Sequence, residues 1–400
     1  MPDFQITGWG FITLILVLTG VAFLGGTVLI PRLRTAGPGK YLLQALTLVL
    51  TSVLVLASVG VLMNRANHWY TNWDELFSGP PSVADARHQV YGRELPDHVQ
   101  PAAVETAAHA ATALQQNPST IPELAGRLNP HASTGQYVEF PLPGSVSGQQ
   151  YQVMVWLPAS YLKEPQRFYP VIIGFTGFPG STDTYRRSID YGRMIEQSAQ
   201  QGSMREAIFV VPEVFPGNYD SECVDATQNQ QGQTSPKAET YVTQDLVPWL
   251  RENLRIFDDA AAWATEGYSA GGWCSAMMPL RHPQLFGSGM SQSGYFDPQY
   301  TDGQQWNPPH ETRYHLAQIA AQHPPRVNLH VFTSSDDEIS WPSTQKFLNA
   351  VKPPLSVTAE VLPSGGHRLD VWQPGMQEGL AWLGRTSPYF TPSAPVSPRT

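Results

Sequence analysis

Cysteine and lysine are scarce in this 400-residue chain, which has two cysteines and only five lysines among its 24 basic residues. Its 33 acidic residues give a formal net charge of −9 at pH 7. Because nucleic-acid phosphates bind basic surfaces, this charge argues against DNA or RNA as a partner. The sequence has no G-x-G-x-x-G motif and no P-loop, and its His and Cys residues do not cluster at metal-ligand spacing. We therefore predict no nucleic-acid partner, no metal and no cofactor.

Charged residues are absent from two long stretches near the N-terminus. Residues 8–30 and 41–63 are each 23 residues long and contain no charged side chain. A helix of this length crosses a hydrocarbon core of about 30 Å. The first residues, Met-Pro-Asp, lack the basic region of a signal peptide, and a second span follows. We therefore predict that residues 1–66 form a two-helix transmembrane hairpin.

The connection between the two spans is basic. It contains Arg32, Arg34 and Lys40 and no acidic residue. The positive-inside rule places such a short loop in the cytoplasm. Both ends of the hairpin then face outward, so we expect a two-pass protein of the cell membrane whose large domain is extracytoplasmic.

The two cysteines, Cys223 and Cys274, both lie in the region that we expect outside the cytoplasm. An even cysteine count in an oxidising compartment indicates a disulfide. Closing a loop of about 50 residues would stabilise the fold by about 4 kcal/mol in the chain-entropy model. We therefore predict a Cys223–Cys274 disulfide.

The composition changes near residue 135. Residues 67–134 are mixed and are predicted to form a juxtamembrane linker with short helices. The apolar runs after them are typical of short buried strands and alternate with stretches of helical periodicity. These runs cover residues 137–144, 149–159, 169–175, 207–214, 261–269, 286–294, 327–335 and 356–366.

Alternating strands and helices indicate an α/β domain with a mostly parallel sheet and helices on both faces. We place this domain at residues 135–386. Residues 387–400 are rich in proline and are predicted to be a disordered tail.

A G-x-S-x-G motif, Gly267-Tyr268-Ser269-Ala270-Gly271, follows one of these strands and precedes a helix. This is the context of a nucleophile elbow, a tight turn that needs small neighbours around an exposed serine. The motif alone is a weak signal, but this context makes it a strong one. We predict that Ser269 is a catalytic nucleophile.

The base and the acid of a serine triad follow the last two strands of such a sheet. His367 follows the last predicted strand, in the sequence Pro-Ser-Gly-Gly-His-Arg. The preceding strand ends in Asp336 and Asp337, and either carboxylate could orient the imidazole. We favour Asp337, with Asp336 as the alternative.

An acyl-transfer site also needs two N–H donors for the oxyanion. The first usually belongs to the residue after the nucleophile, here Ala270, and the second to a loop after an early strand. That loop is residues 174–181, and Phe178 is our choice for the second donor. Pro179 has no N–H and is excluded.

Four motifs occur in the order GFTGFPGS, DSECVD, EGYSAGGWC and GGHRLDVW. Together they resemble the esterase D / antigen 85-like family of putative esterases, whose membrane-anchored versions are familiar from actinobacteria. The resemblance covers roughly residues 135–385 and implies an α/β-hydrolase fold with a Ser-His-Asp/Glu triad, here Ser269, His367 and Asp337. The family's usual His-Gly in the oxyanion loop is replaced by Thr176-Gly177.

The family includes esterases, thioesterases and mycolyltransferases, and a shared fold does not choose among them. We expect a membrane-anchored, extracytoplasmic serine esterase that forms an acyl-enzyme from an ester or lipid-like small molecule. One alternative is a mycolyltransferase-like acyltransferase that moves acyl chains to sugar hydroxyls. The other alternative is a non-catalytic envelope scaffold. The presence of candidates for the serine, the histidine and the acid of a triad argues against it.

Overall fold

The computed structural model describes residues 4–33, 37–67, 69–79, 81–93, 121–217, 219–228, 235–301, 305–308 and 311–392. The chain divides into two compact units. The first contains Met1–Asp85, Ser334–Ile339 and Leu362–Val371, and the second contains the rest. Arg34, part of the predicted linker (94–120) and the end of the predicted tail (393–400) lie outside the described residues.

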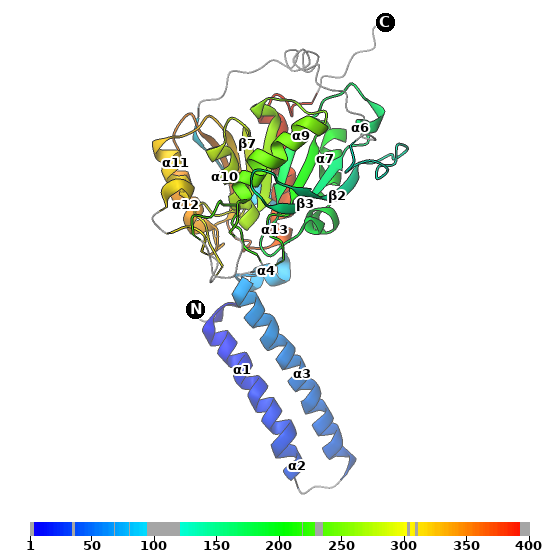
Figure 1. The fold of residues 1–400 in the computed structure, drawn as a ribbon. Helices are drawn as coiled ribbons and strands as arrows, with labels where there is room; N and C mark the ends of the chain where they lie inside the picture. The colour runs from blue at the N-terminus through cyan, green and yellow to red at the C-terminus, as the bar shows by residue number, and fades with distance from the viewer. Residues whose placement is uncertain are drawn as a thin grey trace. The chain divides into compact units, whose positions relative to one another are not determined.

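Two long apolar helices begin the first unit. The first comprises α1 (Trp9–Leu24), a π-helical turn (Gly25–Leu29) and α2 (Ile30–Arg32), and the second is α3 (Pro38–Asn67). Helices α1 and α3 run side by side (Figure 1), and the hydroxyls of Thr19 and Ser58 are 3.0 Å apart between them. Both helices are long and apolar enough to cross a membrane. Most of their large apolar side chains are exposed, which is costly in water and matches the predicted hairpin.

A single nine-stranded sheet, counted over the described residues, forms the centre of the second unit (Figure 1). Its spatial order is β1-β9-β8-β7-β6-β4-β5-β3-β2. The strands are β1 (Arg87–Gly92), β2 (Gln136–Pro143), β3 (Gln150–Leu157), β4 (Val171–Phe175), β5 (Ile208–Pro212), β6 (Trp263–Tyr268), β7 (Ser288–Gln292), β8 (Asn328–Ser334) and β9 (Ser356–Leu362).

The middle of this sheet is parallel, because β4 pairs with β5 and β6, β6 with β7, and β7 with β8 in that sense. Strands β2 and β3 extend one side in antiparallel pairing, and β1 pairs antiparallel with β9 at the other edge. Strands β4 to β7 are buried along their whole length. In the sequence, a strand that is covered on both faces is a continuous run of apolar residues and does not alternate between apolar and polar residues.

Helices follow the parallel strands, as the alternating pattern predicted. The α-helices after α3 are α4 (Trp73–Ser78), α6 (Ser160–Lys163), α7 (Tyr191–Gln200), α8 (Ala238–Thr240), α9 (Val247–Asn253), α10 (Ala270–Arg281), α11 (Leu316–Gln322), α12 (Trp341–Ala350) and α13 (Leu369–Thr386). π-Helical turns occupy Thr184–Ile189 and Tyr241–Leu246, and 3-10 turns occupy Val83–Asp85, Ala260–Ala262 and Thr312–Tyr314. The predicted α/β fold with a mostly parallel sheet is confirmed.

Two segments differ from the sequence-based assignment. Residues 87–92, which we assigned to the linker, form β1. This edge strand is almost wholly exposed and has no apolar run, so its sequence lacks a strand signal. Residues 387–392, which we assigned to a disordered tail, pack on the domain: Phe390 is fully buried, and the Tyr389 hydroxyl bonds Asp259 at 3.1 Å. The free energy gained by burying these aromatic rings outweighs the tendency of the local prolines to favour disorder.

A buried acidic side chain, Glu239, organises the polar contacts between α8 and α10. One of its oxygens is 2.6 Å from Arg281 Nε and 2.7 Å from His282 Nε2, and the other accepts from the Tyr314 hydroxyl at 2.6 Å. Burial by itself would raise the pKa of this carboxyl, but bonds from His282, Arg281 and Tyr314 outweigh it and lower the pKa from 4.5 to about 2. The charged carboxylate therefore stabilises the fold.

We expect the substitution Glu239→Gln to lower the free energy of unfolding by about 3 kcal/mol near neutral pH. Because the folded-state pKa is depressed, this contribution is complete above the unfolded pKa of 4.5 and is lost as the pH falls towards about 2. Urea unfolding of both proteins at several pH values would measure it. The exposed Glu252→Gln is the control, and a difference for Glu239→Gln that does not shrink in acid would contradict the prediction.

Candidate active site

Ser269 lies at the turn between β6 and α10. Strand β6 ends at Tyr268, helix α10 begins at Ala270, and Ser269 has φ 57° and ψ −125°. A positive φ is strained for a non-glycine residue and needs support from its surroundings. Part of that support is the backbone bond from Ser269 N–H to the carbonyl of Gln292 at 2.9 Å, at the end of β7. This is the geometry of a nucleophile elbow.

The two glycines of the G-x-S-x-G motif are needed because the backbone is crowded here. A Cβ added at Gly267 would lie 2.0 Å from the Gly271 carbonyl oxygen. A Cβ added at Gly271 would lie 2.0 Å from the Phe175 carbonyl oxygen, at the end of β4. Side chains at either position would therefore force the turn apart. These contacts explain why the turn needs small residues on both sides of the serine, as the sequence predicted.

The predicted oxyanion loop approaches the same turn. A Cβ added at Gly177 would lie 3.1 Å from Ser269 Cβ, so the loop backbone passes directly beside the serine. Ala270 is the first residue of α10, and the first N–H groups of a helix have no intrahelical acceptor. Phe178 follows Gly177, with its ring 5.9 Å from that of Phe215. The roles of Ala270 and Phe178 as oxyanion donors stay predictions.

His367 and Asp337 come together in the first unit. His367 Nδ1 lies 2.8 Å from Asp337 Oδ2, and the Asp337 side chain is fully buried. The other Asp337 oxygen accepts the N–H of Ile339 at 3.0 Å. A carboxylate opposite Nδ1 accepts a hydrogen bond, which assigns the imidazole proton to Nδ1 and leaves Nε2 as the basic nitrogen.

The neighbouring acid, Asp336, has other partners. Its Oδ2 accepts from the Thr71 hydroxyl at 2.5 Å, and its Oδ1 accepts from the N–H of Gly366 at 3.2 Å. Asp337 is therefore the carboxylate that contacts the His367 ring. Ser269 belongs to the second unit, and its place in a triad with His367 and Asp337 stays a prediction.

The DSECVD motif forms a buried loop beside α10. Glu222 is fully buried, and it accepts hydrogen bonds from the Tyr295 hydroxyl and from the N–H of Gln299. Burial and then the nearby Asp220 raise its pKa well above the usual value. Trp273 of α10 donates to the Glu222 carbonyl at 2.8 Å. Over the described residues, no group of three or more His, Cys, Asp or Glu side chains could hold a metal ion.

A disulfide joins this loop to α10. It links Cys223 and Cys274, which are 51 positions apart, as the sequence predicted. Cys274 is in the second turn of the helix that begins immediately after Ser269, so the bond ties the loop to the helix that supports the elbow.

We expect the double substitution Cys223→Ala/Cys274→Ala to lower the free energy of unfolding by about 4 kcal/mol, the loop entropy of a closed segment of this length. Thermal unfolding of the oxidised wild type and the double variant would measure the difference. The control is wild type treated with a reductant, which should reproduce the loss. An unchanged melting temperature in both samples would contradict the prediction.

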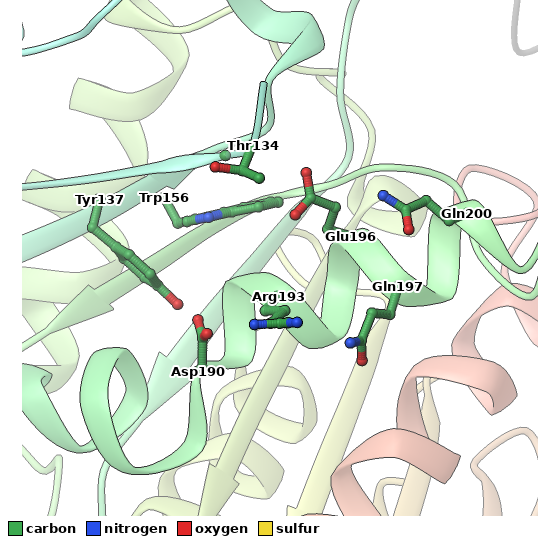
Figure 2. Close-up of a pocket in the computed structure, with 9 residues that line it drawn as sticks. Thr134, Tyr137, Trp156, Asp190, Arg193, Glu196, Gln197 and Gln200 are labelled. Carbon is green, nitrogen blue, oxygen red and sulfur yellow. The ribbon is translucent and has the colours of Figure 1, made fainter. Parts of the chain in front are cut away.

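A cavity of about 390 Å³ lies elsewhere in the second unit, between α7 and the β2–β3 edge (Figure 2). Its lining residues are Thr134, Gly135, Tyr137, Trp156, Asp190, Arg193, Glu196, Gln197 and Gln200. Trp156 is only 2% exposed, because Gly135 and Gly192 lie against its ring. The indole therefore offers no free face for stacking. None of the lining residues is a predicted catalytic residue, and we assign the cavity no role in catalysis.

Two buried residues near His367 are not among the site residues predicted from the sequence. Arg368 directly follows the histidine and is buried, and its Nη1 lies 3.0 Å from Oε2 of Glu75, which is also buried. The local signal for Glu75 was the Asn72-x-x-Glu75 spacing at the start of α4, where Asn72 caps the helix. No local pattern indicates that this glutamate pairs with an arginine near the other end of the chain.

Comparison with known proteins supports this fold. The family model described as "Putative esterase" matches residues 144–383. An uncharacterized protein of Corynebacterium glutamicum is 24% identical over 201 residues, which is 49% of this chain and 44% of that protein. The match therefore spans less than half the length of that relative.

Three solved structures resemble the domain. A ferulic acid esterase is 17% identical and covers 63% of this chain and 99% of its own, with a TM-score of 0.53. An S-formylglutathione hydrolase from Agrobacterium tumefaciens is 16% identical and covers 64% and 97%, with a TM-score of 0.54. A fluorophosphonate-binding serine hydrolase of Staphylococcus aureus is 14% identical and covers 63% and 99%, with a TM-score of 0.50. At these identities the likeness shows a shared fold.

The expected α/β-hydrolase fold and the family resemblance are both confirmed by these matches. The family match covers more than half of the chain and contains the elbow motif and the loops of Asp337 and His367. This chain belongs to the putative esterase family.

Proposed function

We propose that this protein is a serine esterase in which Ser269 is the nucleophile, His367 the base and Asp337 the acid. The observation that carries the proposal is the strained φ of Ser269, held at the strand-to-helix turn of an esterase-family fold. A polar residue in an ordinary glycine turn would not need this conformation. The hydrogen bond between His367 and Asp337 supports the same assignment.

In the proposed mechanism, His367 Nε2 takes the proton of the Ser269 hydroxyl as Oγ attacks the ester carbonyl. The backbone N–H groups of Ala270 and Phe178 stabilise the negative oxygen of the tetrahedral intermediate. His367 then protonates the leaving alkoxide, which departs as the alcohol and leaves an acyl-enzyme on Ser269. Water attacks this ester with His367 as the base, which releases the carboxylic acid and restores the serine. Asp337 keeps the Nδ1 proton in place and stabilises the charged imidazole.

Labelling of the full-length, detergent-solubilised chain with a fluorophosphonate tests this proposal. An activated serine displaces fluoride and gains the mass of the phosphonyl group, and one solved structure of the same fold is described as fluorophosphonate-binding. We expect one adduct on wild type and none on Ser269→Ala. No adduct on a folded, disulfide-bonded wild type would overturn the proposal and favour a non-catalytic scaffold.

We further propose that the hairpin anchors the domain to the outer face of the cell membrane. The two apolar helices are joined by a short basic connection that contains Arg32 and Lys40. The Cys223–Cys274 disulfide fits an oxidising compartment. Protease added to intact cells should digest the domain. A domain that resists the protease until the cells are lysed would reverse the proposed orientation.

The substrate class that follows is a carboxylic ester reachable from the membrane surface. Transfer of the acyl group to a sugar hydroxyl uses the same acyl-enzyme, with the sugar in place of water. Product analysis with an ester donor and trehalose separates the two outcomes. Free acid as the main product supports an esterase, and acylated sugar as the main product would replace this assignment with an acyltransferase.

A further inference from the structure

A buried polar cluster in the first unit connects the segment after α3 to the loop that carries His367. Glu75 of α4 is 3% exposed and Arg368 is 6% exposed. Charged side chains are rarely buried this deeply unless they are paired. Arg368 Nη1 donates to Glu75 Oε2 at 3.0 Å and to the Trp69 carbonyl at 3.0 Å. The guanidinium also lies over the Tyr70 ring, 4.5 Å from its centroid.

Glu75 contacts the His367 loop on both sides of the histidine. Its Oε1 accepts the N–H of Gly365 at 3.0 Å, two residues before His367. Its Oε2 accepts from Arg368, the residue immediately after His367. Gly365 and Gly366 have φ of 153° and 63°, conformations that L side chains rarely adopt. The Glu75 carboxylate thus restrains the loop on both sides of His367, at Gly365 and at Arg368. Without these bonds, the two glycines would leave the loop flexible.

The same segment also contacts the loop of the acid. The Thr71 hydroxyl donates to Asp336 Oδ2 at 2.5 Å, and Asp336 Oδ1 accepts from Gly366 N–H at 3.2 Å. Asp336 is the neighbour of Asp337 in the chain, so Thr71 is linked to both loops. A single hydroxyl and a single carboxylate from the juxtamembrane segment therefore reach the loops of the predicted acid and base.

Glu75 is also held by hydrogen bonds to residues of its own segment. Its N–H donates to the side chain of Asn72 at 3.0 Å, and Asn72 Nδ2 donates to Glu75 Oε1 at 2.9 Å. The Thr71 N–H adds a bond to Glu75 Oε2 at 3.0 Å. Burial and the nearby Asp336 raise the pKa of Glu75, whereas the Arg368 guanidinium at 3.0 Å favours the charged carboxylate.

We propose that Glu75 is a positioning residue of the active site, which sets the His367 loop through Gly365 and Arg368. This inference rests on the proposed function, because it takes His367 as the catalytic base. Glu75 does not touch the substrate or the reacting atoms. Helix α4 is the next helix after α3. The segment that leaves the hairpin (Figure 1) therefore positions the loop of the catalytic base and does not serve only as a linker.

The test compares Glu75→Gln with Asp74→Asn in the full-length chain in detergent, with a p-nitrophenyl ester as substrate. Glu75→Gln keeps the size and one acceptor oxygen but removes the charge that pairs with Arg368. We expect kcat to fall about 10- to 100-fold with little change in KM, because a small displacement of the base affects the chemical step. Asp74 is exposed, so Asp74→Asn should keep the wild-type kcat.

Two further readouts separate positioning from a general loss of structure. Fluorophosphonate should label Glu75→Gln to the same final stoichiometry as wild type but more slowly, whereas a misfolded fraction would lower the stoichiometry. Arg368→Gln should show a similar loss in kcat, and the double variant should lose no more than the single ones, because both side chains act through one contact.

A wild-type kcat for Glu75→Gln, or an equal loss for Asp74→Asn, would overturn the inference. Lower labelling stoichiometry at an unchanged rate would also overturn it. If Glu75→Gln does not fold, Thr71→Val provides the test, since it removes the hydroxyl bonds to Asp336, Glu75 and Asn72 but keeps the Thr71 N–H bond to Glu75. An unchanged kcat there would count against positioning by this segment. A wild-type chain without Ser269-dependent labelling would instead refute the proposed function, whatever the Glu75 variants do.

Discussion

Substitution of Ser269 by alanine is expected to lower kcat for a p-nitrophenyl ester by about 10⁶-fold, because no acyl-enzyme can form without the hydroxyl. Residual turnover would come from water attack assisted by the remaining oxyanion donors and by substrate binding. The strained turn at Ser269 should persist in the variant, since it depends on the crowded backbone at Gly267 and Gly271. Steady-state kinetics, together with a melting curve to establish folding, would measure the effect.

The matched control is Ser188→Ala, which removes an exposed hydroxyl outside the elbow. This variant should have the kinetics of wild type. If Ser269→Ala kept more than a small part of the activity while folded, another residue would have to be the nucleophile. The assignments of His367 and Asp337 would then lose their basis, because both are inferred as partners of Ser269.

The second large effect is expected from Asp337→Asn, which should lower kcat by about 10⁴-fold. Asparagine has nearly the same shape but can present an amide N–H to His367 Nδ1. The imidazole would then carry its proton on Nε2, where it cannot accept the proton of Ser269. Because the Asp337 side chain is fully buried, water does not readily replace the lost carboxylate. The measurement is kcat with the same ester across neutral pH.

Asp336→Asn is the control that discriminates between the two neighbouring acids. Asp336 bonds the Thr71 hydroxyl and the Gly366 N–H, whereas the carboxylate 2.8 Å from His367 Nδ1 is that of Asp337. We expect a much smaller loss in kcat for this variant. A larger loss for Asp336→Asn than for Asp337→Asn would reverse the assignment and restore the alternative that the sequence left open.

Much of the fold was predictable because its signals are local. A buried parallel strand such as β4 or β6 is a continuous apolar run, and a helix follows each of these strands within a short distance in the chain. The elbow is the clearest case, since its two glycines and the serine lie within five consecutive residues. The disulfide was predictable for a different reason, because only two cysteines exist and one pairing is possible.

The segments that local patterns misjudged are those whose neighbours are distant in the chain. Strand β1 has an exposed, polar sequence and is a strand only because it pairs with β9. The start of the tail contains prolines, but the rings of Tyr389 and Phe390 find buried sites on the domain. In both cases tertiary packing outweighs local propensity.

Local sequence patterns were sufficient to predict most strands and helices of the domain, the G-x-S-x-G turn, the two apolar helices and the disulfide. Tertiary structure alone decided which of two adjacent aspartates faces His367, because that depends on how two loops meet. It alone revealed Glu75, whose partner Arg368 is 293 positions away. A hydrogen bond needs its two atoms about 3 Å apart and aligned, and only the folded path of the chain sets such distances between remote residues.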